Sequence, residues 1–80
     1  MKVTVLVRTR DGVLDPQGEA IDRSLRGLGY PTAGVRAGKV FDLELDAVDR
    51  VTAHRQANEL AERVLSNPLI EDFEVVVHGS

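Results

Sequence analysis

Few residues of this 80-residue chain could carry out chemistry. The chain has no cysteine, and its only histidines are His54 and His78. It therefore has no thiol nucleophile and no cysteine-ligated zinc or iron–sulfur site. His54 falls on the polar side of an expected helix, without an acidic or histidine partner at metal-binding spacing, and His78 stands near the end of the chain. We interpret both as solvated surface histidines.

The remaining polar motifs do not form a catalytic set. Glu71 and Asp72 are adjacent, so they cannot face each other across a substrate as an acid–base pair. Gly38 and Lys39 look like part of a phosphate loop, but no Gly-x-x-x-x-Gly precedes the lysine and no Ser or Thr follows it. A hairpin turn with an exposed cation is the preferred interpretation. The sequence thus predicts no catalytic, cofactor-binding or metal-binding residue.

Composition and charge argue against nucleic acid and a membrane as partners. Thirteen acidic residues outnumber ten basic ones, and the only aromatics are Tyr30, Phe41 and Phe73. A chain with this balance has neither the positive charge nor the stacking side chains of a nucleic-acid binder. The N-terminal residues 1–5 do not resemble a signal peptide, and no transmembrane segment is expected, so we predict a cytoplasmic protein. A chain this short buries about 60% of its surface, which favours an oligomer or a larger partner.

The first two elements predicted from the sequence are a strand and a helix. The alternation of Val3, Val5 and Val7 with other residues predicts a first strand. Because both of its faces are partly apolar, we expect this strand to be central in its sheet. Asp15 suits a helix N-cap and Pro16 the first helical position. The apolar stripe of this helix consists of Ile21, Leu25 and Leu28, and Gly29 ends it.

The rest of the chain is expected to form three further strands and a second helix. Residues 33–37 and 40–46 are expected to form two strands of a hairpin, with Gly38 and Lys39 as its turn. A longer helix is predicted from about residue 49 to residue 65, followed by a strand at residues 73–78. The buried stripe expected for that helix contains Ala53, Ala57, Leu60, Ala61 and Val64.

The predicted order is therefore β-α-β-β-α-β in a single domain of residues 1–80. This order is typical of a ferredoxin-like α+β two-layer sandwich, with an antiparallel sheet and two helices on one face. The chain lacks the Cys-x-x-Cys of heavy-metal carriers and the stacking aromatics of RNA-recognition domains. Asp11 and Asp15 would repel the anion of an acylphosphatase-like site. An ACT-like regulatory module that binds a small molecule remains open as an alternative.

The loop before the first helix has one feature that helix capping leaves unexplained. Gly18 falls in the first helical turn, where glycine costs stability. A close approach of another backbone or of a ligand would account for this glycine.

Three ordered motifs resemble a known family. Residues 7–21, VRTRDGVLDPQGEAI, resemble the N-terminal signature of PurS, the small subunit of bacterial and archaeal phosphoribosylformylglycinamidine (FGAM) synthase. Residues 34–39, GVRAGK, and residues 66–73, SNPLIEDF, agree with the family in the same order. The departures are mild: Phe73 stands where a tyrosine is common, and Leu69 where a smaller aliphatic residue is common.

The resemblance implies a PurS-like fold and a role in the fourth step of purine biosynthesis. In that family the PurQ glutaminase subunit releases ammonia and the PurL synthetase subunit activates the substrate with ATP. The complex uses ATP, Mg²⁺ and glutamine, whereas PurS-like chains have no active site and bind no cofactor alone. They dimerise, bridge PurQ and PurL, and support ammonia transfer. A homodimer or dimer of dimers, extended through edge strands, is therefore expected.

The matched motifs also supply candidate partner-binding residues. These candidates are Asp15, Pro16, Gln17, Gly18, Gly38, Lys39, Asn67, Pro68 and Glu71.

Overall fold

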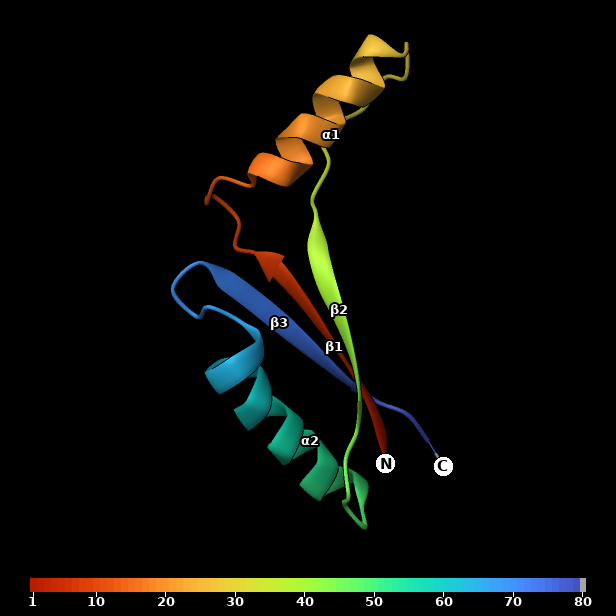
Figure 1. The fold of residues 1–80 in the computed structure, drawn as a ribbon, viewed down its shortest axis with the longest axis vertical. Coiled ribbons are helices and arrows are strands. Elements are labelled where there is room, and N and C mark those ends of the chain that lie inside the picture. Colours follow the sequence, from red (N-terminus) through yellow and green to blue (C-terminus); the bar gives the residue numbers. More distant parts are fainter. Residues whose placement is uncertain (80) are drawn as a thin grey trace.

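The computed structural model describes residues 1–79, and Ser80, the last residue of the predicted domain, lies outside the described residues. Three antiparallel strands form one sheet in the order β2-β1-β3. The strands are β1 (Lys2–Thr9), β2 (Gly38–Glu44) and β3 (Glu71–Val77). The helices are α1 (Pro16–Gly27) and α2 (Arg50–Leu60), and α2 continues into a π-helical turn, η1 (Ala61–Leu65) (Figure 1). The predicted α+β class with an antiparallel sheet is confirmed.

Strand β1 is the centre of the sheet, as its two partly apolar faces predict. Val5 lies opposite Phe41 of β2 and Val75 of β3. The side chains of Val3, Val5 and Val7 are buried on one face. On the other face the alternate residues of β1 remain partly or fully exposed. One face of the sheet therefore carries the core.

Helix α2 covers that face. Its buried residues are Ala53 and Ala57, followed by Ala61 in η1. Because alanine side chains are short, this stripe lets the helix approach the valines of β1 closely. Helix α2 packs on β1 and β3 rather than on β2. The apolar side chains of β2 over this face, among them Phe41 and Leu43, are consequently only half-buried.

The second helical run matches its predicted span but not all of its predicted stripe. Asp49 caps α2 by accepting a hydrogen bond of 2.7 Å from the Thr52 N–H. The π-helical turn adds backbone to the last turn and rotates the residues after it away from the phase of an α-helix. Val64 is 71% exposed and Leu60 is also exposed, so the predicted burial of these two residues is wrong.

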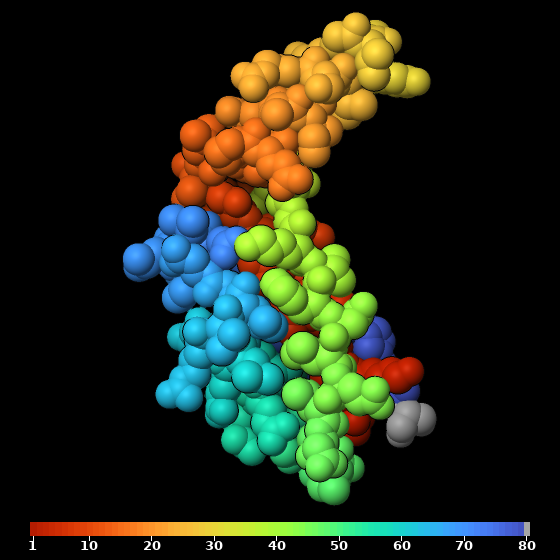
Figure 2. All heavy atoms as spheres, viewed as in Figure 1, coloured from red at the N-terminus to blue at the C-terminus, as the bar shows by residue number. Residues whose placement is uncertain are grey.

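Helix α1 stands apart from the sheet. It projects beyond the end where β1 finishes and β2 begins, which makes the molecule long and narrow, 49 × 27 × 15 Å (Figures 1 and 2). Of its predicted apolar stripe, Leu28 is 74% exposed and Ile21 is 39% exposed. The prediction that both helices cover one face of the sheet is therefore wrong for the single chain.

The cause lies in residues 33–37. They form no strand and no hairpin, and instead lead from α1 into β2. Gly38 and Lys39, predicted as a turn, are the first two residues of β2. A Cβ on Gly38 would lie 2.5 Å from the Val7 carbonyl oxygen, so this glycine permits close strand contact. The predicted four-stranded order is thus reduced to three strands.

Residues 1–79 contain no helix that is both long and apolar enough to cross a membrane.

Candidate partner-binding site

Most candidate residues meet at the joint, which we define as residues 9–18, 35–39 and 67–72. The end of β1 and the starts of β2 and β3 lie side by side here, because both neighbours of β1 are antiparallel to it. The residues around a hollow of about 340 Å³ are Thr9, Asp15, Pro16, Gln17, Ala37, Gly38, Lys39 and Glu71. The structure therefore brings together one part of each of the three sequence motifs.

Asp15 fastens α1 to the strand that follows it. Its Oδ1 accepts a hydrogen bond of 3.0 Å from the Gly18 N–H, which confirms the predicted N-cap. Its Oδ2 accepts one of 2.9 Å from the Ala37 N–H, just before β2. The hydrogen bond from Gly18, the one from Ala37 and the charge of Arg36 hold the pKa of the Asp15 carboxyl below its ordinary value. One carboxylate thus joins two segments that are distant in sequence.

Gly18 is buried beneath that carboxylate. A Cβ at this position would lie 2.5 Å from both the Val35 carbonyl oxygen and the Asp15 Oδ2. The glycine that the helical pattern left unexplained is therefore required by the chain's own backbone. Gly18 positions α1 against residues 35–37 and does not face the hollow.

Asn67 and Pro68 shape the turn that enters β3. The Asn67 N–H donates to Glu71 Oε1 at 2.7 Å, and the Glu71 N–H donates to the Asn67 carbonyl oxygen at 2.8 Å. Arg10 Nη2 donates to the Pro68 carbonyl oxygen at 2.6 Å, and Arg10 Nε lies 3.4 Å from Asp72 Oδ1. These contacts tie the turn to the end of β1 and hold Glu71 at the rim of the hollow.

Gln17 and Lys39 are the side chains that the joint leaves free. Both are exposed, and neither takes part in the side-chain hydrogen bonds or ion pairs formed within residues 1–79. Asp15, Gly18 and Asn67 have contacts inside the chain. The candidates consequently divide into residues that build the joint and residues, Gln17 and Lys39 above all, that are available to a partner.

Backbone N–H groups engage two carboxylates of the joint, Asp15 and Glu71. Asp15 accepts two of these hydrogen bonds, at 3.0 and 2.9 Å, and Glu71 accepts one at 2.7 Å. Across residues 1–79, no group of three or more His, Cys, Asp or Glu side chains is placed to hold a metal ion.

The two histidines lie away from the joint. His54 is exposed and contacts Asn58 of its own helix at 2.9 Å. His78 Nε2 lies 2.7 Å from Thr4 Oγ1, which donates to Asp42 Oδ1 at 2.8 Å. His78 is exposed, as predicted, and its side chain contacts the open face of the sheet. The strand pairing continues to this residue, because the His78 N–H donates a hydrogen bond to the Lys2 carbonyl oxygen. The alternation of residues 73–78 in the sequence indicated this.

Comparison with known proteins identifies the family to which this fold belongs. The family model "PurS: Phosphoribosylformylglycinamidine (FGAM) synthase" matches residues 2–79. The chain belongs to the PurS family. The PurS subunit of Archaeoglobus fulgidus FGAM synthase is 36% identical over 77 residues, which are 95% of this chain and 96% of the relative. The Thermotoga maritima PurS subunit is 37% identical over 75 residues, 92% of each chain.

Solved structures agree with the fold. Bacillus subtilis PurS is similar with a TM-score of 0.85 and 35% identity, covering 98% of each chain. A chain in the structure of PurLQS from Thermotoga maritima has a TM-score of 0.85 and 37% identity, covering 94% of this chain and 93% of that one. The PurS-like fold expected from the three motifs is confirmed.

Proposed function

We propose that this chain is the non-catalytic small subunit of an FGAM synthase complex in cytoplasmic purine biosynthesis. It bridges a PurQ-like glutaminase and a PurL-like synthetase and supports the transfer of ammonia between them. The likeness over 94% of the chain to a protomer within PurLQS carries this proposal. The chain alone binds no cofactor, and the ATP, Mg²⁺ and glutamine of the reaction are used by the larger subunits. An ACT-like module rested only on the shared order of elements, and no described residue favours it.

Physical chemistry gives such a bridge a purpose. Ammonia in neutral water is mostly ammonium, which has no lone pair for attack on the activated substrate. Holding the glutaminase and the synthetase in register raises the effective concentration of free ammonia at the second site. The joint, with Gln17 and Lys39 exposed at its rim, is the surface that we assign to this contact.

The bridging unit is a homodimer, or a dimer of dimers. Helix α1 exposes Leu28 and Ile21, while the core face over β2 has no helix from its own chain. These two incomplete surfaces match: α1 of one copy can cover the Phe41 and Leu43 side chains of the other. Each copy then buries apolar area that it cannot bury alone.

The edge of β2 supports the same arrangement. Met1 and Leu45 exchange two hydrogen bonds, of 2.7 and 2.9 Å. By alternation, the backbone groups of Val40 and Asp42 therefore face outward from the sheet. Residues 33–37 of a second copy can pair along this free edge. The dimer would then contain the fourth strand and the second covering helix that the sequence pattern predicts.

Reconstitution tests the bridging role. Purified PurL-like and PurQ-like subunits from the same organism are assayed with and without this chain, using glutamine or a high concentration of ammonium chloride as the nitrogen source. Omitting the chain should abolish complex assembly and glutamine-dependent synthesis but leave ammonia-dependent synthesis unchanged. Equal assembly and an equal glutamine-dependent rate without the chain would reject the proposal.

Light scattering tests the homodimer. The expected mass is twice 8.7 kDa or more at micromolar concentration. Leu28→Asp should convert this species to a monomer, because Leu28 is exposed in the single chain and buried in the proposed dimer. A wild-type chain that is monomeric under these conditions would contradict the arrangement.

A further inference from the structure

The sheet has a second free edge, along β3, which the proposed homodimer does not use. The Arg10 N–H donates to the Ile70 carbonyl oxygen, and the His78 N–H donates to the Lys2 carbonyl oxygen. Even-numbered residues of β3 therefore pair with β1, and the backbone groups of Phe73, Val75 and Val77 face outward. A free edge of this kind is a template for another strand.

Along this edge, only backbone groups at the two ends form hydrogen bonds within the chain. The Glu71 N–H donates to the Asn67 carbonyl oxygen at 2.8 Å. At the other end Arg50 Nη2 donates to the Val77 carbonyl oxygen at 3.0 Å. Within residues 1–79, the outward N–H and C=O groups of Phe73 and Val75 have no such partner. Four adjacent backbone groups thus remain open in the middle of the strand.

A groove runs beside these open groups. It has a volume of about 520 Å³ and lies between β3 and the start of α2, lined by Arg50, Val51, His54, Val75, Val76 and Val77. Val51 is 80% exposed on the helix side. A strand laid along β3 would direct every second side chain onto this apolar surface.

We propose that the β3 edge and its groove bind an extended acidic–apolar segment of one of the larger subunits. This inference rests on the proposed function, and it names a docking surface separate from the joint. The added strand forms main-chain hydrogen bonds to Phe73 and Val75. Its apolar side chains contact Val51.

The charge of the residues that line the groove favours an acidic partner segment. The charged side chain that lines the groove is Arg50, and the groove's titratable neighbour is His54. No carboxylate lines the groove, although the chain as a whole carries a net charge of −3. A carboxylate of the added strand beside Arg50 gains a partner, whereas a lysine there would be repelled.

The proposed homodimer joins its two copies through β2, which leaves β3 for an unlike strand. The pairing of β3 with β1 is continuous, and residues 71–77 contain no proline or lysine to block addition of a strand. The edge is therefore open to an unlike strand.

A matched pair of variants tests the groove. Val51→Asp places a carboxylate at the apolar surface, in the first turn of α2, where a negative charge is compatible with the helix dipole. Val64→Asp makes the same change at a residue that is 71% exposed and outside the groove. We expect Val51→Asp to weaken binding of the larger subunits at least 10-fold and Val64→Asp to change it less than 2-fold. Both variants should keep the wild-type circular dichroism spectrum and dimer mass.

Amide hydrogen exchange gives the second readout. In the assembled complex the amides of Phe73 and Val75 should exchange at least 10-fold more slowly than in the free chain. Those of Glu74 and Val76, already bonded to β1, should change little. Normal assembly without protection of Phe73 and Val75 rejects the docking edge while sparing the proposed function. Protection already present in the free homodimer makes a second copy the occupant and also rejects it. Failure to assemble with any partner rejects both.

Discussion

The body of this molecule, formed by the sheet and α2, differs sharply from its arm, formed by α1 and residues 28–37. The body buries valines of β1 against alanines of α2 and has a full ladder of strand pairs. The arm has almost no buried side chain, and Gly18 is its one buried helical residue. Local polar contacts order the arm instead, such as Asp15 at its joint and Asp22 with Thr32 and Arg26.

This difference separates two kinds of stability. Burial in the body acts within one chain, so this part of the stability does not depend on a second copy. The apolar stripe of α1 stabilises nothing until another surface covers it. The arm is therefore the part whose stability should depend on the concentration of the chain and on its partners.

Truncating the body core should have the largest effect. Val5 is fully buried at the centre of the sheet, and Val5→Ala removes two methyl groups and leaves a cavity. The expected loss is about 2–3 kcal/mol in the free energy of unfolding. Urea denaturation followed by far-UV circular dichroism, at one fixed protein concentration, measures it. A loss smaller than that of any arm variant would overturn the comparison.

Two glycine replacements in α1 should change the free energy of unfolding in opposite directions. Gly18→Ala forces a methyl group against the Val35 carbonyl oxygen, and we expect a loss of about 1–3 kcal/mol. Gly27→Ala is the matched control in the same helix, because a Cβ there would meet nothing within 4 Å. It should stabilise α1 by about 0.5–1 kcal/mol through helix propensity. Thermal denaturation of both variants shows whether the two signs differ as expected.

Acid should loosen the joint and the start of α2 together. The pKa values of Asp15 and Asp49 are lowered in the folded chain, in each case first by a backbone hydrogen bond. The unfolded chain therefore binds more protons, and stability falls as the pH drops from the ordinary value of 3.8 through the lower folded values. Asp15→Asn should flatten this acid-dependent loss in the arm. Asp49→Asn should flatten it in the body, as measured by urea midpoints at a series of pH values.

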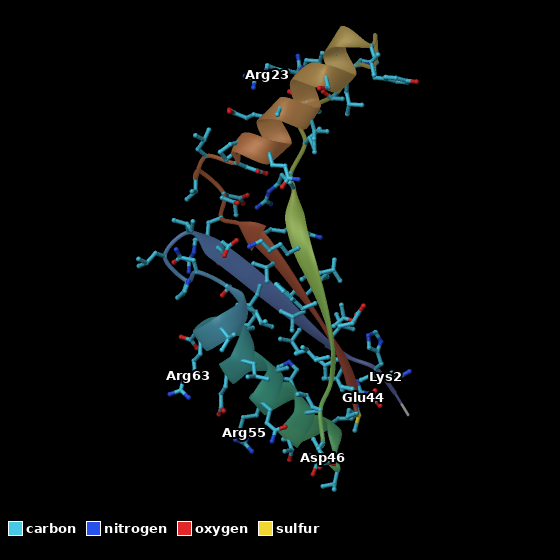
Figure 3. All side chains as sticks on the ribbon, in the orientation of Figure 1. Lys2, Arg23, Glu44, Asp46, Arg55 and Arg63 are labelled. Atoms are coloured by element: carbon cyan, nitrogen blue, oxygen red, sulfur yellow. The ribbon has the colours of Figure 1, made fainter. Side chains whose placement is uncertain are left out.

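The exposed rim of the joint should affect binding with little effect on folding. Gln17→Ala and Lys39→Ala should each weaken binding of the larger subunits by about 3–10-fold. Their free energy of unfolding should stay within about 0.5 kcal/mol of wild type, as for exposed side chains in general. Arg23→Ala, farther along α1 (Figure 3), is the control and should bind as wild type does. Undiminished binding of both rim variants would remove the joint from the contact surface.

Sequence reasoning was most accurate where a few neighbouring residues settle the structure. The cap at Asp15, proline at the first position of α1 and the central strand around Val5 all follow from local rules, and the structure confirms them. It was weakest at Gly38, where a glycine fits both a turn and a close strand contact. Only the Val7 carbonyl oxygen, 31 positions earlier in the chain, distinguishes the two.

The candidate site followed the same pattern. Three motifs supplied its residues, but no local pattern shows that Asp15, Lys39 and Glu71 surround one hollow. Their meeting depends on the antiparallel register of β1 with both neighbours. The free edge of β3 was likewise hidden, because the odd-numbered residues that face outward are known only once the pairing with β1 is known.

By itself the sequence determined the two helices, three of the four expected strands, the helix caps and the family. Short-range spacing and residue chemistry are sufficient for these. The tertiary structure alone decided that residues 33–37 run on into β2, that α1 stands away from its own sheet, and that two sheet edges stay open. Those outcomes depend on contacts between distant segments, where the free energy of burial and the strand register outweigh local preference.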